Sequence, residues 1–103
     1  MPRKEVRERI LDRGRILNEA WIGDAVLWLY ARAKILREDG RIDSAKAERM
    51  TSNRFLSTFG DASEVEAEIG RAYESEGLAA AFARIEEWLM PVFAKQEANR
   101  AKR

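Results

Sequence analysis

Two carboxylic acids in this chain stand among apolar and small neighbours instead of in water-facing sequence. At helical spacing, Asp24 has alanine, tryptophan and leucine neighbours, and Glu66 has alanine, isoleucine and glycine neighbours. Two carboxylates brought together suit a hard cation such as Mg²⁺ or Mn²⁺, which prefers oxygen ligands and water. A cation held in this way activates water and offsets the charge that builds on a phosphate during phosphodiester hydrolysis.

Two glycines give a reason to place these acids close together. Gly23 directly precedes Asp24, and Gly70 follows Glu66 by one helical turn. A glycine inside a helix costs roughly 1 kcal/mol relative to alanine, and close approach of another helix or of a ligand would offset that cost. A tight crossing of two helices at the glycines would bring the two carboxylates together.

Each acid also has a simpler structural explanation. Asp24 would be paired with an arginine at a helix–helix contact, because burying an unpaired charge costs several kcal/mol. Glu66 would be the capping-box partner of Ser63, in a Ser-x-x-Glu pattern at the start of a helix. The residues alone leave these explanations open beside the metal-binding one.

Composition restricts the possible chemistry. The 103 residues contain no cysteine and no histidine, which excludes thiolate sites, imidazole ligands and every nucleophile–histidine arrangement. Any catalysis must come from carboxylates, hydroxyls, lysine or arginine. The sequence has no apolar run of about 18 residues and its N-terminus leads into charged residues. We therefore expect a cytoplasmic protein with no membrane partner.

The hydrophobic pattern predicts one all-α domain, residues 1–103, with about five helices. Apolar residues recur at spacings of three and four, no segment alternates with a period of two, and a chain of this length has no room for a second core. The helices are expected over 3–13, 18–38, 44–59, 63–75 and 78–98. Their boundaries are predicted from glycine, proline and capping residues: Gly14, Asn18, Gly40, Asp43, Ser63, Gly77 and Pro91.

The net charge of +1 conceals an uneven distribution. Residues 61–90 carry two basic and eight acidic side chains, whereas 1–15, 41–60 and 91–103 are each net basic. These basic parts are either solvated helix faces or surfaces that contact phosphate groups.

Three stretches resemble the catalytic domain of ribonuclease III. Residues 17–27, Leu-Asn-Glu-Ala-Trp-Ile-Gly-Asp-Ala-Val-Leu, resemble the family's defining helix and are most similar to Mini-ribonuclease III, which lacks a double-stranded-RNA-binding domain. Residues 49–56 resemble the family's stretch ending in Val-Ser-Asn-x-x-Leu, and residues 64–73 resemble Phe-Glu-Ala-Leu-Ile-Gly-Ala-Ile-Tyr. The stretches occur in the family's order and cover roughly residues 16–93.

The resemblance implies a metal-dependent endoribonuclease that hydrolyses structured or double-stranded RNA as a homodimer. Asp24 and Glu66 match the family's catalytic, metal-binding acids and would hold Mg²⁺ or Mn²⁺. Trp21 matches the aromatic residue that enters a socket on the partner subunit, and Ile22 and Trp28 would share this dimer interface. The residues expected to contact RNA are Arg3, Lys4, Arg7, Lys46, Arg49, Asn53 and Arg54.

The chain departs from the family pattern at several positions. Leu17 and Ala20 stand where the common form has glutamates, and Ser63 stands where it has an aspartate. Only four residues separate Phe59 from Glu64, where relatives have a loop and further helical residues that help to grip RNA. The alternatives are a catalytically inactive relative that serves as an RNA- or ribosome-binding scaffold or dimerisation module, and an unrelated helical interaction domain.

Overall fold

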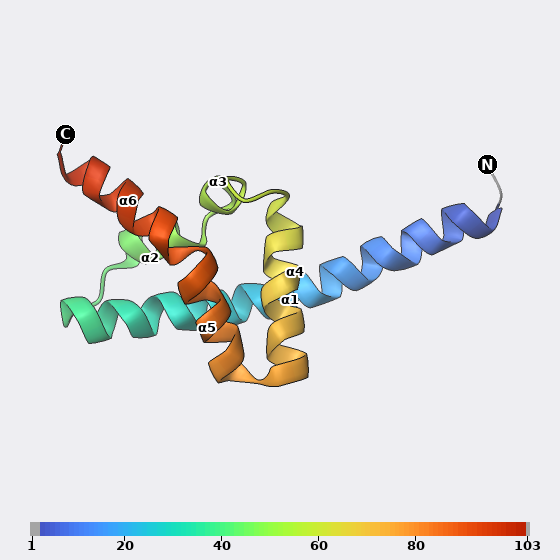
Figure 1. The fold of residues 1–103 in the computed structure, drawn as a ribbon, viewed down its shortest axis with the longest axis horizontal. Coiled ribbons are helices and arrows are strands. Elements are labelled where there is room, and N and C mark those ends of the chain that lie inside the picture. The colour runs from blue at the N-terminus through green and yellow to red at the C-terminus, as the bar shows by residue number, and fades with distance from the viewer. Residues whose placement is uncertain (1–2, 103) are drawn as a thin grey trace.

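The computed structural model describes the backbone of residues 3–102 and the side chains of residues 12–102. The predicted all-α class is confirmed, and no strand occurs between residues 3 and 102. None of the helices in this range is both long enough and apolar enough to cross a membrane. The helices are α1 (Arg3–Asp39), α2 (Ser44–Thr51), α3 (Asn53–Leu56), α4 (Ala62–Glu76), α5 (Leu78–Trp88) and α6 (Met90–Ala101) (Figure 1).

α1 is one continuous helix where the sequence predicted two. The predicted end at Gly14 and the predicted cap at Asn18 both lie inside it, so both predictions are wrong. A glycine ends a helix well when it adopts a positive φ, as Gly40 does at 72° after α1. Gly14 has no positive φ, and the good helix formers around it outweigh its cost of about 1 kcal/mol.

The N-terminal half of α1 projects from the body of the molecule, whereas its C-terminal half is packed (Figure 1). This projection makes the fold long: the principal extents are 54 × 31 × 21 Å. The radius of gyration is 15.6 Å, compared with about 13 Å for a compact domain of this size. A helix that projects in this way exposes a side that a second chain can cover.

The predicted helix over 44–59 is divided at Ser52. The backbone of Ser52 is extended, with φ −69° and ψ 150°, and its hydroxyl accepts a hydrogen bond from the Phe55 amide at 3.1 Å. The predicted cap at Asp43 is confirmed, because its carboxylate accepts from the Lys46 amide at 3.0 Å. Serine therefore acts here as a second helix start that the apolar spacing did not indicate.

The last predicted helix, 78–98, is likewise divided, between α5 and α6 at Leu89. Pro91 lies in the first turn of α6, where its missing N–H leaves no intrahelical hydrogen bond unmade. The predicted interruption at this proline is confirmed.

The start of α4 differs from the prediction at a position that concerns Glu66. Asp61, not Ser63, is the N-cap, and its carboxylate accepts from the Glu64 amide at 3.1 Å. Ser63 is already inside the helix, so the Ser63–Glu66 capping box is wrong. The predicted end at Gly77 is confirmed by a φ of 95° and a hydrogen bond from its amide to the Tyr73 carbonyl at 2.9 Å.

The fold is centred on the crossing of α1 and α4, which meet backbone against backbone. A Cβ added to Gly23 would overlap the Glu66 carbonyl and lie 2.9 Å from the Gly70 amide nitrogen. A Cβ added to Gly70 would overlap the Glu19 carbonyl and lie 3.1 Å from the Gly23 amide nitrogen. The predicted tight crossing at these glycines is therefore confirmed.

Beside this crossing, apolar side chains from all six helices form one core. Its largest completely buried members are Leu27, Met50, Leu56, Ile69, Ile85 and Leu89. Because the core includes Leu27 from α1 and Ile69 from α4, the crossing angle and the packing depend on each other.

We predict that Gly70→Ala destabilises the protein by about 3 kcal/mol or more, because the methyl group meets backbone that cannot move aside. Gly14→Ala is the matched control, since nothing lies within 4 Å of the Cβ position there. That variant is expected to be neutral or stabilising by up to about 1 kcal/mol. Urea denaturation followed by circular dichroism measures both, and equal effects would contradict the close contact.

Candidate metal-binding carboxylate pair

Asp24 and Glu66 form a carboxylate pair at the α1–α4 crossing. Each acid lies close to one of the contacting glycines along its own helix, so the backbone contact fixes where the two side chains begin. The two carboxyl groups lie within hydrogen-bonding reach of each other. Both side chains are partly exposed, so solvent reaches the pair.

The pair is electrostatically strained in the absence of a cation. The pKa of Glu66 is raised from 4.5 to about 8. Burial is the main cause, because it penalises the charged form, and the hydrogen bond with Asp24 and its negative charge follow. Near neutral pH, Glu66 therefore holds a proton that a cation would displace.

The simpler explanations of the two acids fail within the described part of the chain. Asp24 makes no ion pair with any side chain from residues 12–102, so no arginine there compensates its charge. The capping box predicted for Glu66 does not form, because Asp61 is the N-cap of α4 and Ser63 already lies inside the helix. Two acids that cost free energy to bring together thus have no structural partner other than each other.

The pair could supply two carboxylate ligands to a metal ion. Among residues 12–102, no group of three or more acidic side chains is placed to share one ion. Mg²⁺ usually binds through one or two carboxylates and keeps several waters, whereas Ca²⁺ and structural zinc need more protein ligands. Asp24 and Glu66 would supply the two carboxylates, and water or phosphate oxygens would complete the shell.

An ion pair flanks the crossing and was missed from the sequence. Glu19 Oε2 accepts a hydrogen bond from Arg71 at 2.7 Å, and the Glu19 side chain is only 16% exposed. Glu19 stands four residues before Gly23, as Glu66 stands four before Gly70. The sequence signal for this ion pair was the position of Arg71. It directly follows Gly70, so the helix crossing places it near α1.

The predicted RNA-contact residues divide into three groups. Lys46 pairs with Asp39 at 2.8 Å, and Arg49 makes a two-point contact with Glu97 at 3.0 and 2.8 Å. Asn53 and Arg54 are exposed on α3. Arg54 makes no ion pair among the side chains described. The side chains of the remaining three lie outside the described residues: Arg3, Lys4 and Arg7.

The predicted dimer-interface residues also behave differently from one another. Trp21 is 79% exposed on α1, whereas Ile22 and Trp28 are partly buried and pack against the core. Leu17 and Leu29, spaced from Trp21 by four and eight residues, are also exposed on this helix. α1 therefore presents an apolar side to solvent, and Trp21 is the most exposed large hydrophobic residue among residues 12–39 of this helix.

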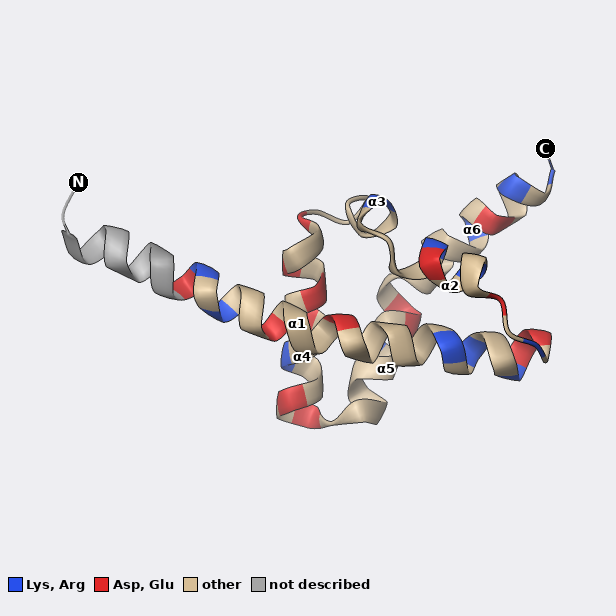
Figure 2. Ribbon diagram, turned by 180° about the vertical axis from the view of Figure 1, so that it is seen from behind, with Lys and Arg blue, Asp and Glu red and all other residues tan. Residues whose placement is uncertain are grey.

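Charge follows the distribution that the sequence indicated. Figure 2 shows acidic residues recurring along α4, while the C-terminal end of α6 is basic. Glu66 therefore lies on the acidic α4, whereas the described residues expected to contact phosphates lie on α2 and α3: Lys46, Arg49, Asn53 and Arg54.

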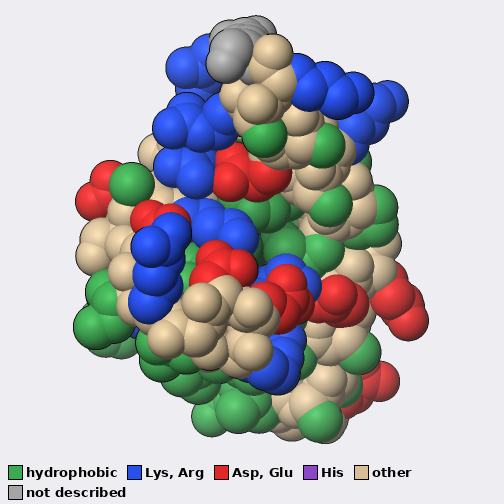
Figure 3. Space-filling view, turned by 90° about the vertical axis from the view of Figure 1, so that its left-hand side faces the viewer, with side chains coloured by type: hydrophobic (Ala, Val, Ile, Leu, Met, Phe, Trp, Pro, Cys, Tyr) green, Lys and Arg blue, Asp and Glu red, His purple; other side chains and the backbone are tan. Residues whose placement is uncertain are grey.

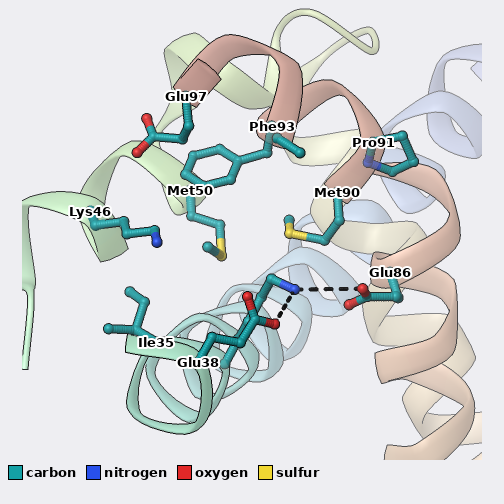
Figure 4. Close-up of a pocket in the computed structure, with 11 residues that line it drawn as sticks. Ile35, Glu38, Lys46, Met50, Glu86, Met90, Pro91, Phe93 and Glu97 are labelled. Atoms are coloured by element: carbon teal, nitrogen blue, oxygen red, sulfur yellow. Dashed lines mark hydrogen bonds and ion pairs between the residues drawn. The ribbon is translucent and has the colours of Figure 1, made fainter. Parts of the chain in front are cut away.

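A separate cavity of about 380 Å³ opens between α1, α2 and the junction of α5 with α6 (Figure 4). Lys34 lines it, with its ammonium 2.7 Å from a Glu38 oxygen and 3.5 Å from a Glu86 oxygen. Met50 and Met90 provide apolar walls. The lysine charge is compensated and the carboxylate pair is not part of the lining, so this cavity is not an extension of the candidate site.

No family model, curated protein or solved structure matches this chain. What the protein does must therefore be inferred from the geometry of its own residues.

The raised pKa of Glu66 predicts a pH dependence of stability. Between pH about 4.5 and about 8 the folded protein retains a proton at Glu66 that the unfolded chain has lost. The free energy of unfolding therefore falls as pH rises through this range. Glu66→Gln stays neutral, so we expect its melting temperature to fall less than that of the parent between about pH 5 and about pH 9.

Glu74→Gln, an exposed position on the same helix, is the control and should retain the parent's pH dependence. Thermal melts at matched ionic strength measure the three proteins. Parallel curves for the parent and Glu66→Gln would show that Glu66 does not titrate in this range.

Proposed function

We propose that this protein is a metal-dependent endoribonuclease that hydrolyses phosphodiester bonds in structured or double-stranded RNA in the cytoplasm. The observation that carries the proposal is the carboxylate pair: two acids forced together by a glycine–glycine crossing, with no basic partner in the described part of the chain. The same residues carry the resemblance to the ribonuclease III catalytic domain.

In this proposal Asp24 and Glu66 hold Mg²⁺ or Mn²⁺ together. The bound ion supplies activated water and offsets the negative charge of the phosphate in the transition state. Glu66 would contribute by exchanging its proton for the cation, whose charge would offset the burial and the neighbouring Asp24 carboxylate that raise the pKa of Glu66. The absence of histidine is compatible with this chemistry, because metal-activated water needs no imidazole base.

Recognition of the RNA would rest on its phosphates and its shape. Duplex RNA is recognised mostly through phosphates and 2′-hydroxyls, so little base specificity is expected. Of the candidate contact residues described, Lys46 and Arg49 are engaged in ion pairs, whereas Arg54 and the neutral Asn53 remain available. Affinity should therefore fall as salt concentration rises.

We also propose that the protein acts as a homodimer. A tryptophan that is 79% exposed on an apolar side of α1 is costly in a monomer, and a second copy would bury it. Two chains would then carry two carboxylate pairs, one for each strand of a duplex.

A catalytically inactive RNA- or ribosome-binding scaffold is the second candidate. It is favoured by the small number of acids at the site: no third carboxylate joins the pair among residues 12–102, and Leu17 and Ala20 occupy positions where the family has glutamates. The two candidates share the fold and differ in whether a metal ion is held.

A cleavage assay separates them. We expect the parent to cut a long RNA duplex in the presence of Mg²⁺, and Asp24→Asn and Glu66→Gln each to lower the rate by roughly a hundredfold or more. Glu74→Gln is the control for loss of one exposed acid on α4. Duplex binding without cleavage by the parent would support the scaffold, and cleavage that persists in both variants would remove the carboxylate pair from the mechanism.

Light scattering tests the dimer. We expect Trp21→Ala to convert a dimeric parent into a monomer, because it removes the most apolar surface from the exposed side of α1. Ile42→Ala is the matched control: this residue is 83% exposed but lies beyond the C-terminal end of α1. A monomeric parent would contradict the proposal, as would equal effects of the two substitutions.

A further inference from the structure

A polar cleft of about 470 Å³ lies between α3 and α6. We call it the α3–α6 cleft. Its lining residues come from α2, α3, α6 and the segments beside α3, and none comes from α1 or α4. The cleft is therefore built independently of the carboxylate pair.

The lining of the cleft carries excess positive charge, and an ion pair fixes two of its helices to each other. Three arginines and one glutamate line it. The glutamate, Glu97, binds Arg49 through two hydrogen bonds of 3.0 and 2.8 Å, which joins α6 to α2. The remaining arginines, Arg54 and Arg100, make no ion pair with residues 12–102, so two positive charges remain available to a ligand.

Arg100 is the basic residue in the last turn of α6. Figure 3 shows basic side chains clustered around this end of α6 on one face of the molecule. A cation is favourable at the C-terminus of a helix, and the negative charge of Glu97 also acts on Arg100, although the two make no ion pair within 4 Å. Its guanidinium remains free to make two-point contacts with phosphate oxygens.

Neutral hydrogen-bonding groups complete the lining. Thr58, Gln96 and Asn99 are exposed in the cleft and make no side-chain hydrogen bond within the described residues. Hydroxyl and amide groups of this kind bind phosphate oxygens and sugar hydroxyls. The two aromatic residues of the cleft, Phe55 and Phe93, are buried against each other edge to face, so they cannot stack on bases.

We infer that the α3–α6 cleft binds the phosphodiester backbone of RNA through Arg54 and Arg100, with Thr58, Gln96 and Asn99 as neutral contacts. The two arginines offer two charged contacts for phosphate oxygens, and the buried aromatics favour a duplex backbone over unstacked bases. The inference rests on the proposed function for the identity of the polymer. It adds a contact site that lies on helices other than those of the carboxylate pair.

Fluorescence anisotropy with a labelled RNA duplex in EDTA tests the cleft without cleavage. Arg54→Gln and Arg100→Gln are each expected to weaken binding roughly tenfold, and each should lower the slope of log affinity against log salt by about one. Arg41→Gln is the matched control, because it removes an exposed arginine outside the cleft. It should change the affinity by less than about twofold.

Equal losses for Arg41→Gln and the cleft variants would overturn the inference, since general electrostatics would then explain the binding. A parent that binds no duplex, or a complex displaced equally well by poly-glutamate, would also overturn it. The proposed function fails separately: if the parent binds and the cleft variants weaken binding, but no duplex is cut with Mg²⁺, the cleft stands and the enzyme does not. If the parent does cut, Arg54→Gln with Arg100→Gln should raise KM and leave kcat unchanged.

Discussion

The contact between the backbones of α1 and α4 at Gly23 and Gly70 is the constraint on which the rest of the structure depends. Neither helix can carry a Cβ at these positions, because the opposing carbonyl and amide groups already occupy the space. The close approach aligns Leu27 and Ile69 in one core and brings Asp24 beside Glu66. Packing and the candidate chemistry therefore share one origin, and the two cannot be altered independently.

The carboxylate pair is a local cost that this contact imposes. Two acids near each other, one of them half-buried, raise the pKa of Glu66 to about 8 and have no arginine partner within the described chain. Nearby, the same crossing pairs Glu19 with Arg71, so the fold does compensate acids where compensation serves stability. An uncompensated pair beside a compensated one is typical of a site whose partner is a ligand.

The arginines that could bind phosphate lie away from the carboxylate pair, in the α3–α6 cleft. The Arg49–Glu97 pair fixes α6 to α2 and leaves Arg54 and Arg100 free beside it. The acidic α4 and the basic end of α6 are thus held apart by the helices between them. Under the proposed function, this separation would let a polyanion bind at the basic end while a cation at the acidic crossing offsets its charge.

The sequence by itself determined the helical class, the caps at Asp43 and Gly77 and the close crossing at the two glycines, because these depend on local hydrogen bonding or on the absence of a side chain. The continuation of α1 through Gly14 is also local, because the helix formers beside it along the chain outweigh a glycine's cost of about 1 kcal/mol. Only the tertiary structure decided which charges are paired. Lys46 and Arg49 have partners that lie far along the chain or on another element, and Arg54 and Arg100 make no ion pair among the residues described. Spacing along a chain cannot show which charges meet, because pairing depends on how distant helices pack.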